Sequence, residues 1–560
     1  MMTLGRQLHS VENANRALRN AAEAALRDVV TSEPFREYSS QDIGRRATVV
    51  PIRSFEFNVP ATHVDNYYSP DFNDDPENIL GPVLEGMIPV VTSQDPASLL
   101  AAFNKRCNFM QAPKNDEIAD KEFKMAIDLI RSLPRQEHWS ENDDDRERWL
   151  NKFDDTKRKR MVEAWSTMSD ASRRDISSKQ LMVKIETLLK REDDEWAPRA
   201  IYVGTDAHNA LTGPAMMVAM ERWCALLDTD NDGHRLGPVD FRYGYKRDDV
   251  YLCEHLTRDS KCRVTLEGDY SRNDREQRSR VAYIIDAALE VLGFDSEVRK
   301  WMLESSEEYE VFAPLCGLKA KLKHQLPTGT TCTTFRNSVF NSVMFATSMI
   351  QQGVTNARAL VLGDDLLANS QEDIRLQEWI NCVDRFKMVL KAFKPGLSGK
   401  ATFLSRRLIM NGTTPCLVPK IGKALARFNV RASKNPSITD DEYMAGKALA
   451  HAYEFRHVPC CARMFIDRFK IHNANQGLED KPLEHDSWFL KISGLTTPRQ
   501  VLNAVLSCPI TVSEEDFTDW IADTYEVGWD DMKDLMEQVI LSTEYTVLET
   551  GIFDEIAIDF

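Results

Sequence analysis

The clearest hydrophobic pattern in the chain begins at Cys262. From there to Asp269 the residues alternate in character, with Val264, Leu266 and Gly268 on one side and Arg263, Thr265 and Glu267 on the other. A period of two is typical of a β-strand with one buried face. We therefore predict a strand that ends at Asp269.

A helical pattern follows this strand. Between residues 281 and 292 the apolar positions recur at intervals of three and four: Val281, Ile284, Ile285, Ala288, Leu289 and Leu292. That spacing predicts an α-helix with one apolar face, and Gly293 supplies a helix stop. Further on, two apolar arms in residues 359–368 flank Gly363-Asp364-Asp365, which predicts a β-hairpin with polar residues at its tip. Strand, helix and hairpin in this order indicate an α+β fold.

Length and composition indicate a large globular protein. A chain of 560 residues, 42% hydrophobic and 28% charged, is long enough for roughly two to four subdomains. It contains no apolar run of about 18 residues and no apolar segment typical of a secretory signal, so we expect an intracellular protein without a direct membrane span. The eleven cysteines include no Cys-x-x-Cys pair, which favours reduced thiols.

The net charge of −17 is unevenly distributed. Residues 511–560 hold fifteen Asp or Glu and one Lys, a balance of −14, so residues 1–510 carry only about three net negative charges. Interspersed aromatic residues favour a folded acidic face for this segment. By contrast, residues 401–434 contain seven Lys or Arg and no acid. Such a stretch could follow a phosphate backbone, and solvated surface charge is the alternative.

Three carboxylates suggest metal-dependent chemistry. Transfer of a nucleotidyl group needs two divalent cations, and Mg²⁺ prefers carboxylate oxygens. Asp269 at a strand end and Asp364-Asp365 at a hairpin tip meet if both elements are neighbours in one antiparallel sheet. Taken alone, a Gly-Asp-Asp sequence is more often an ordinary turn, because Gly and Asp favour turns for local reasons.

Two further motifs accompany these carboxylates. Asp269-Tyr-Ser-Arg-Asn-Asp274 precedes Thr328-Gly329-Thr-Thr-Cys-Thr333-Thr-Phe-Arg-Asn337, and Gly363-Asp364-Asp365 follows. In this order they resemble motifs A, B and C of viral RNA-dependent RNA polymerases. Thr328 stands where that family usually has Ser. The later segment that ends with Val418-Pro419-Lys420 looks most like the polymerases of nodaviruses and tombus-like positive-strand RNA viruses.

The resemblance implies a role for each matching residue. Asp269, Asp364 and Asp365 would hold two Mg²⁺ or Mn²⁺ ions, with Asp365 as an auxiliary ligand. Asp274 and Asn337 would bind the ribose 2′-hydroxyl, a group that both donates and accepts, with help from Thr333. Gly329 would let the motif B loop move. Each residue also has an ordinary structural explanation. Asp274 would cap a helix, Asn337 would be a polar helix residue, and Gly329 would only interrupt the secondary structure.

Other segments are similar to the remaining motifs of the same family. Lys184 and Arg199 match motif F, which binds the phosphates of the nucleotide, and surface ion pairing is the alternative for both. Lys391 and Lys394 are both candidates for the general acid of motif D. Ser405, Arg406 and Arg407 match motif E, which contacts the primer and template.

The resemblance also implies a right-hand architecture of fingers, an antiparallel-sheet palm and a thumb, with a largely helical remainder. We expect an N-terminal extension over 1–159 that bridges fingers and thumb, fingers over 160–262, a palm over 263–400 with a fingers segment at about 294–327, a thumb over 401–510 and an acidic segment over 511–560.

The expected function is template-directed RNA synthesis for an RNA virus. Its partners would be the RNA template and product, ribonucleoside triphosphates and other viral or host replication proteins in the cytoplasm of the infected cell. A reverse transcriptase and a non-catalytic RNA-binding scaffold with a palm fold are the alternatives. Finally, residues 228–233 imitate the start of an EF-hand, but Val239 occupies the twelfth position, so we expect a polar loop there.

Overall fold

A computed structural model of the chain describes most residues from 79 onward. The described residues are 59, 61–63, 79–92, 94, 96–109, 116–167, 177–190, 198–258, 264–271, 273–313, 318–396, 399–432, 437–474, 477–485 and 487–560. Residues 1–58 of the expected N-terminal extension lie outside this set, as do Cys262, Arg263, Arg272 and Lys434. Helices and strands both contribute substantially, so the α+β prediction is confirmed.

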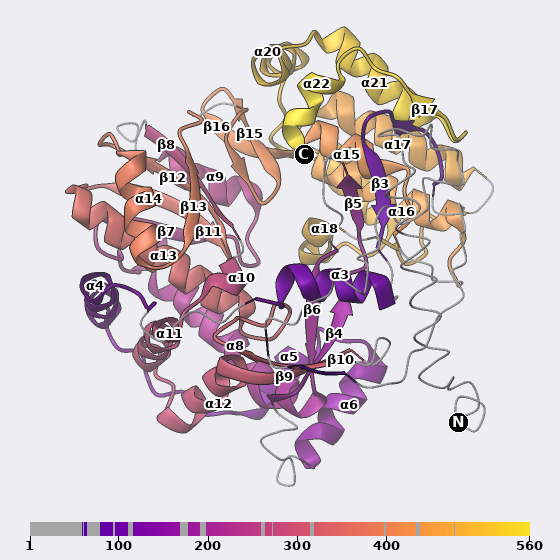
Figure 1. The fold of residues 1–560 in the computed structure, drawn as a ribbon. Coiled ribbons are helices and arrows are strands. Elements are labelled where there is room, and N and C mark those ends of the chain that lie inside the picture. Colours follow the sequence, from indigo (N-terminus) through magenta and orange to yellow (C-terminus); the bar gives the residue numbers. More distant parts are fainter. Residues whose placement is uncertain are drawn as a thin grey trace, which may run out of the picture.

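A five-stranded sheet, here called the central sheet, carries the predicted strand and hairpin (Figure 1). Its strands, in spatial order, are β13 (Val389–Phe393), β8 (Val264–Ser271), β12 (Asp365–Ser370), β11 (Ala357–Leu362) and β7 (Val239–Tyr243). Neighbours pair antiparallel except β7 and β11, which run parallel. The hairpin prediction is confirmed by β11 and β12, and the strand prediction by β8, which continues two residues past Asp269.

Both faces of the central sheet are covered, because alternate side chains enter different cores. Val361 and Leu366 join the largest core, together with the helices behind the sheet. Leu360 and Leu367 point the other way, into a smaller core. The helices of the largest core include α4 (Asp120–Arg131), α8 (Asp206–Leu226), α11 (Ser279–Val291), α12 (Ser296–Glu307), α13 (Thr333–Gln352) and α14 (Leu376–Arg385). Helix α11 confirms the helix predicted over 281–292.

The smaller core joins the central sheet to a neighbouring three-stranded sheet. Its members come from α9 (Asp249–Thr257), the central sheet, β14 (Thr402–Phe403), β15 (Arg406–Asn411) and β16 (Thr414–Pro419). The turn between β14 and β15 is Leu404-Ser405, and both residues have positive φ, which matches the twist of a tight hairpin. This turn presents Ser405 to solvent.

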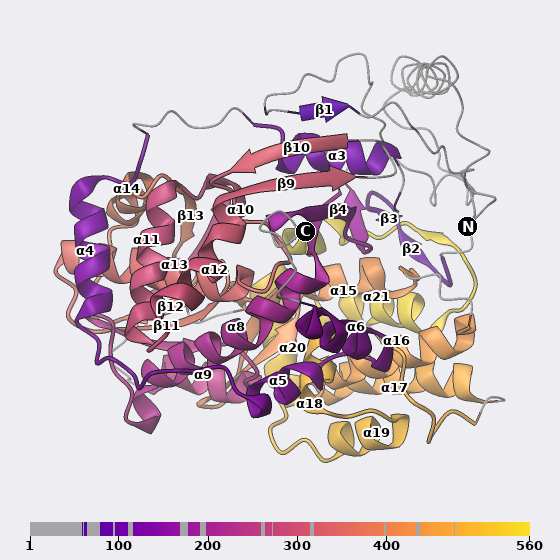
Figure 2. The ribbon, with the colours of Figure 1, turned by 90° about the horizontal axis from the view of Figure 1, so that it is seen from below.

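A second five-stranded sheet, the outer sheet, lies on another side of the molecule (Figure 2). Its order is β1 (Ala61–His63), β10 (Leu318–Lys323), β9 (Glu308–Ala313), β4 (Lys179–Val183) and β6 (Ala200–Gly204). Residues 308–323, which lie in sequence between two strands of the central sheet, therefore pair with strands from residues 179–204. Helix α3 (Pro96–Arg106) shares the core of this sheet.

The C-terminal part of the chain is helical. Its elements are α15 (Ile421–Phe428), α16 (Asp440–Glu454), α17 (Pro459–Asn473), α18 (Trp488–Ser493), α19 (Pro498–Leu506), α20 (Glu514–Tyr525), α21 (Trp529–Leu541), β17 (Val547–Leu548), α22 (Phe553–Ile556) and the 3₁₀ turn η6 (Ala557–Asp559). We call residues 421–560 the C-terminal helices. Phe517, Trp520 and Ile521 of the acidic segment pack in one core with α15 to α17, so this segment is folded.

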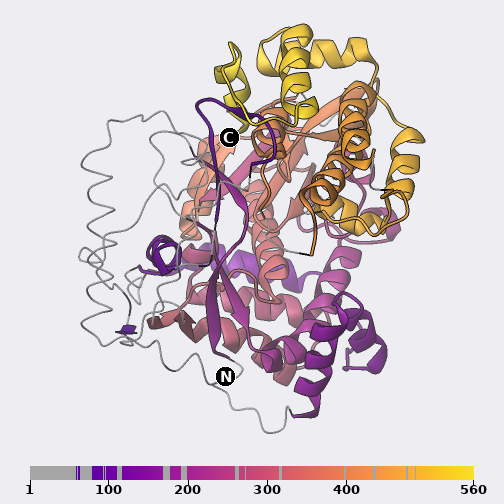
Figure 3. The same cartoon turned by 90° about the vertical axis from the view of Figure 1, so that its right-hand side faces the viewer.

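Residues 79–109 run from the C-terminal helices to the outer sheet (Figure 3). At one end β2 (Val83–Leu84) pairs with β17, and the Leu80 amide donates to the Asn429 carbonyl at 2.7 Å. Further along, β3 (Ile88–Val91) pairs with β5 (Thr187–Lys190), and α3 follows. Three short helices and a 3₁₀ turn complete the described elements: α5 (Asp143–Leu150), α6 (Asp155–Ser166), α10 (Asn273–Glu276) and η4 (Thr229–Asn231).

Two expected boundaries differ from the structure. Strand β7 and helix α9 precede residue 263, yet they belong to the central sheet and its cover, so this unit begins at about residue 239. Residue 510 is not a boundary between two cores, because residues on both sides of it pack in the same core. Both differences have the same cause: contacts between segments far apart in sequence leave no local pattern at the boundary.

Candidate active site

Asp269 and the Gly363-Asp364 turn lie at the same end of the central sheet. Leu366 faces Gly268 across β12 and β8, so the next positions along these strands are Asp365 and Asp269. Gly363 has φ of 66°, a conformation that glycine adopts without strain. Two side chains of α13 hold the turn: the Ser338 hydroxyl accepts from the Gly363 amide at 2.8 Å, and Asn341 donates to the carbonyls of Gly363 and Asp364.

This end of the sheet opens into a cavity of about 820 Å³, here called the cleft. Asp364, Asp274 and Asn337 line it, so residues of the three sequence motifs share one space. Much of the remaining wall is basic, with Lys105, Arg106, Lys152, Lys184, Arg199 and Lys246. A concave site with acids at its floor and cations around it suits a polyanionic substrate that also brings metal ions.

The carboxyl groups of the turn have unusual pKa values. Removal of water by the cleft walls, followed by the negative charges of Asp274 and Asp269, raises the pKa of Asp364 to about 6. The same desolvation, with the charges of Asp364 and Asp269, raises the pKa of Asp365 to about 7. Like charges that are held together without a cation are typical of a functional site.

Asp274 and Asn337 contact one another directly. The Asn337 amide nitrogen donates to Asp274 Oδ1 at 2.7 Å, and the Thr328 hydroxyl donates to the other carboxylate oxygen. Burial raises the pKa of Asp274, and these two hydrogen bonds limit the rise. The expected pair is thus assembled at the cleft wall, and Thr328 provides a hydroxyl within it.

The loop that leads into α13 is tied to the outer sheet. Gly329 has φ of 93°, so a side chain there would be strained. The Tyr202 amide of β6 donates to the Thr328 carbonyl at 2.8 Å. Thr333 lines the cleft, and its hydroxyl donates to the Pro327 carbonyl at 3.3 Å. Gly329 and Thr333 therefore lie close to the Asp274–Asn337 pair.

Lys184 and Arg199 share one carboxylate at the edge of the cleft. Arg199 binds both oxygens of Glu186, and Lys184 lies 3.1 Å from Oε2. Burial alone would raise the pKa of Glu186, but the two cations outweigh it and the pKa falls. Each cation keeps about half of its side chain exposed. Lys184 and Arg199 thus form the ion pairs that we considered as the alternative to phosphate binding, and both residues also line the cleft.

Residues 53–470 match the family model described as RNA dependent RNA polymerase, which is well over half of the chain. The chain belongs to this family of viral RNA-dependent RNA polymerases. The resemblance drawn from the motifs is therefore confirmed, and the protein is an RNA-directed nucleotidyltransferase of positive-strand RNA viruses that binds RNA and nucleotides. A comparison with curated proteins found no match.

The two lysines proposed for motif D lie in different surroundings in the polymerase. Lys391 on β13 stands opposite Asp269 on β8, so the two side chains project from the same face of the sheet. Lys394 lies beyond the paired positions, and its ammonium group binds Asp373 at 2.6 Å. Only Lys391 has a register position beside the expected catalytic carboxylates.

Arg406 and Arg407 do not fit the expected contact with primer and template. Their side chains are only 2% and 4% exposed. Arg406 binds Asp249 of α9, and Arg407 Nε donates to Asp559 at 2.7 Å. Neighbouring residues on a strand point to opposite faces, so the two arginines are buried in different places. Ser405, in contrast, is exposed at the turn and accepts a hydrogen bond from Lys423 at 3.3 Å.

Arg406 belongs to a buried group that we call the joint cluster: Asp249, Arg406, Arg456 and His457. Asp249 is 1% exposed and contacts all three cationic groups. Burial opposes ionisation of Asp249, but the hydrogen bond with His457 and the positive charges of Arg406 and Arg456 hold its pKa well below the usual range. Conversely, the Asp249 hydrogen bond raises the pKa of His457 to about 9 against the effect of burial. The cluster joins α9, β15 and the connection between α16 and α17.

The rest of the basic stretch divides into two groups. Arg431 is buried and bound to Asp440. Lys420, Lys423 and Arg427 recur at intervals of three and four on or beside α15, which places them on one helix face. Burial and the charges of Arg427 and Lys420 lower the pKa of Lys423 to about 8, and its charge in turn acts on Asp365. We call these three residues the α15 stripe; the sequence did not distinguish them from the buried arginines.

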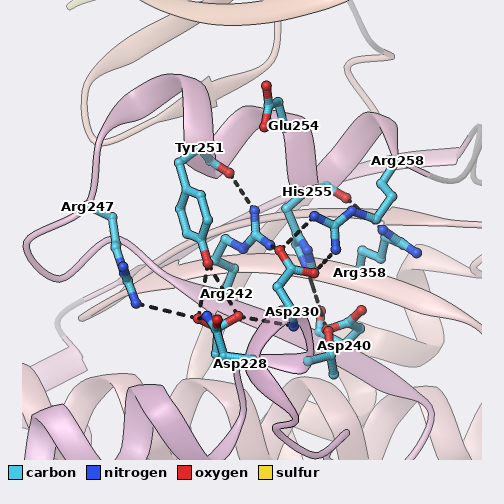
Figure 4. Close-up of polar contacts among 12 residues, drawn as sticks. Asp228, Asp230, Asp240, Arg242, Arg247, Tyr251, Glu254, His255, Arg258 and Arg358 are labelled. Carbon is cyan, nitrogen blue, oxygen red and sulfur yellow. Dashed lines mark hydrogen bonds and ion pairs between the residues drawn. The ribbon is translucent and has the colours of Figure 1, made fainter.

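The loop that imitates an EF-hand lies elsewhere and is filled by guanidinium groups (Figure 4). Arg242 and Arg258 both bind Asp230, while Tyr251 and Arg247 contact Asp228. Arginine charges thus occupy the position that a calcium ion would need. The loop connects α8 to β7 and stabilises the edge of the central sheet.

Among the described residues, no three His, Cys, Asp or Glu side chains already form a metal-binding group. None of the helices in the described ranges is long and apolar enough to cross a membrane.

Proposed function

We propose that the polymerase has a right-hand architecture, with the central sheet as palm, the outer sheet as fingers and the C-terminal helices as thumb. The family membership supports this assignment, as does the position of the cleft, which is lined by residues of all three parts, including Ile492 of α18. Residues 79–109 contact both the fingers and the thumb. They would limit how far the two can separate.

The proposed chemistry is two-metal-ion nucleotidyl transfer at Asp269, Asp364 and Asp365. Carboxylate oxygens are the ligands that Mg²⁺ and Mn²⁺ accept, and the raised pKa values of Asp364 and Asp365 express a repulsion that cations would relieve. When bound, the two ions activate the attacking hydroxyl and neutralise the leaving pyrophosphate. The observation that carries the proposal is that Asp364 lines one cleft together with the Asp274–Asn337 pair, while Asp365 and Asp269 occupy neighbouring positions at the same end of the central sheet.

The other cleft residues would bind and orient the substrates. Arg199 and Lys184 are positioned to exchange part of their contact with Glu186 for the triphosphate, because a guanidinium group binds phosphate oxygens bidentately. Asp274 and Asn337, supported by Thr333, would accept and donate hydrogen bonds to the ribose 2′-hydroxyl. Gly329 would let the adjoining loop shift as the template advances. Lys391 would supply the proton to pyrophosphate.

The substrates would be an RNA template, its product and ribonucleoside triphosphates. Ser405 and the α15 stripe would follow the backbone of the product strand, because the stripe presents three cations on one helix face and the charge of Lys423 acts on Asp365. In the infected cell, the polymerase would replicate and transcribe the viral genome in the cytoplasm, together with other viral or host replication proteins.

The two alternative functions are less well supported. A reverse transcriptase excludes the 2′-hydroxyl with an aromatic side chain, whereas Asp274 here is bound by an amide and a hydroxyl. A non-catalytic scaffold would have no use for carboxylates with raised pKa values at the end of the sheet.

The test is extension by purified full-length protein on an RNA template with Mg²⁺ or Mn²⁺, with ribonucleotides or deoxyribonucleotides. We expect template-length RNA from the wild type, little DNA, and no product from Asp364→Asn. Several kcal/mol of charge stabilisation correspond to a loss of roughly 1,000-fold or more. Product of comparable yield from Asp364→Asn would refute the catalytic assignment. DNA synthesis would favour a reverse transcriptase, and tight RNA binding without product would favour the scaffold.

A further inference from the structure

A chain of hydrogen bonds extends from the Asp274–Asn337 pair into the protein interior. Asn337 Oδ1 accepts from Gln277 Nε2 at 2.8 Å, and Gln277 Oε1 accepts from Arg336 Nε at 2.6 Å. The side chain of Gln277 is fully buried, and that of Arg336 is nearly so. The order of groups is therefore Arg336, Gln277, Asn337 and Asp274, ending at the cleft wall.

The direction of this chain is fixed by chemistry. A guanidinium group has only donors, so it must meet the oxygen of the Gln277 amide. Gln277 then presents its nitrogen to Asn337, which must offer its own oxygen in return. The Asn337 nitrogen is left to face Asp274 and the cleft. One donor-only residue thus sets the orientation of two amides, each of which could otherwise rotate by half a turn.

We infer that Gln277 and Arg336 are positioning residues that fix the Asn337 amide in the orientation needed to discriminate ribose from deoxyribose. The inference rests on the proposed role of Asp274 and Asn337 as the ribose reader. With the amide reversed, the Asn337 oxygen would face the Asp274 carboxylate, and two acceptors would repel each other. The pair could then no longer offer a donor and an acceptor together to a 2′-hydroxyl.

Gln277→Glu is the most direct test, because it changes the hydrogen-bonding direction with almost no change in size. The new carboxylate can pair with Arg336, but it can only accept from Asn337, so it favours the reversed amide. We expect the ribonucleotide to deoxyribonucleotide ratio of kcat/KM to fall by about 10- to 100-fold, since buried groups are left unpaired. The loss should affect kcat/KM for ribonucleotides, whereas kcat/KM for deoxyribonucleotides should change little.

Two further variants keep the inference falsifiable. Gln277→Met removes the chain without adding a charge and should lower the ratio in the same direction. Arg336→Lys keeps a donor-only group and should retain most of the wild-type ratio. An equal loss for both sugar types, with the ratio unchanged in Gln277→Glu and Gln277→Met, would show a merely structural role and overturn the inference.

Asn337→Ala separates this inference from the function on which it rests. If Asn337→Ala retains wild-type discrimination, the pair does not read the ribose and the proposed site itself is wrong. If Asn337→Ala loses discrimination while both Gln277 variants keep it, the reader stands and only the positioning role fails. Thermal unfolding of each variant shows whether a lower activity reflects the site or the fold.

Discussion

The joint cluster contains one buried aspartate and the region of the cleft contains several, yet their carboxyl groups have opposite pKa shifts. Asp249 in the joint cluster contacts Arg406, Arg456 and His457, and its pKa falls. At the end of the central sheet that opens into the cleft, desolvation and other carboxylates dominate the surroundings of Asp364 and Asp365, and their pKa values rise to about 6 and 7. Burial opposes ionisation in both places, so the supply of positive charge decides the sign.

This difference indicates which aspartates serve the fold and which serve the chemistry. The chain itself provides the cations of the joint cluster, so that cluster is complete and its contribution is to stability. At Asp364 and Asp365, desolvation and the neighbouring carboxylates outweigh the cations that the chain provides, so in the proposed mechanism bound metal ions would supply the missing positive charge. The following variants test this division.

Asp249→Asn should have the largest effect on stability. Removal of the one carboxylate leaves Arg406, Arg456 and His457 buried without an opposite charge, a change that typically costs about 3–5 kcal/mol. Chemical denaturation should show this loss. The matched control is Asp248→Asn at the next position, where the side chain is 57% exposed and Asn can still cap the helix.

Asp365→Asn makes the same kind of substitution at a carboxylate that has no stabilising role in the comparison. It removes a charge that its neighbours already disfavour, so the free energy of unfolding should stay the same or rise while RNA synthesis is lost. A destabilised Asp365→Asn, or an Asp249→Asn as stable as the wild type, would contradict the division between the two regions.

The pH dependence of stability should reveal His457. Its pKa is raised from 6.5 to about 9 in the folded state, so the stabilisation is fully present below pH 6.5 and is lost as the pH rises through 9. At about 1.36 kcal/mol per unit, the loss is on the order of 3 kcal/mol. His457→Gln should be less stable at pH 6 and should show a flatter profile between pH 6.5 and 9.

Cys508 is the control for this profile, because its sulfur lies 3.6 Å from His457 Nδ1 and its own pKa is lowered by that histidine. Cys508→Ser removes the thiol and keeps His457 bound to Asp249. The decline above pH 6.5 should therefore persist in Cys508→Ser, reduced in size because the Cys508 contact also contributes to the raised pKa of His457. Its disappearance there, with His457→Gln still showing it, would transfer the effect from the histidine to the thiol.

The sequence predicted those parts of the site that depend on local patterns. Alternation gave the strand that carries Asp269, and the apolar arms around Gly363 gave the hairpin. The pairing of Asp274 with Asn337 followed from motif resemblance, although the two residues are 63 positions apart. Gln277 escaped notice because it lies outside the motifs and has no distinctive neighbours in sequence.

The burial of Arg406 and Arg407 could not be predicted from the neighbouring sequence. Arg406 finds its partner 157 residues away at Asp249, and Arg407 finds Asp559 at a separation of 152. Nothing near either arginine in sequence marks it as buried, so both looked like the lysines of the α15 stripe. The alternation of a strand was the one available signal, since it requires Arg406 and Arg407 to face opposite ways.

Lys391→Met should lower the rate of RNA synthesis without changing the fold. Its position opposite Asp269 favours it as the proton donor, a role worth roughly 100-fold or more in rate. Lys394→Met is the matched control, because Lys394 is bound to Asp373 and should lose little activity. Single-turnover rates at several pH values would separate the two, since loss of a general acid alters the pH profile. The reverse order of effects would assign the role to Lys394.

Lys423→Met should give the smallest change, and it concerns RNA binding rather than chemistry. The α15 stripe has three half-buried cations, and the charges of Arg427 and Lys420 lower the pKa of Lys423, so a phosphate backbone would relieve this repulsion as metal ions would relieve that of the aspartates. Loss of one such contact should weaken RNA binding uniformly across sequences and reduce the slope of log K against log salt by about 1. Lys124→Met on α4 changes an exposed lysine outside the cleft and should leave that slope unchanged. An unaltered slope in Lys423→Met would mean that the stripe, like the joint cluster, is balanced within the protein, and the comparison would then hold only for the acids.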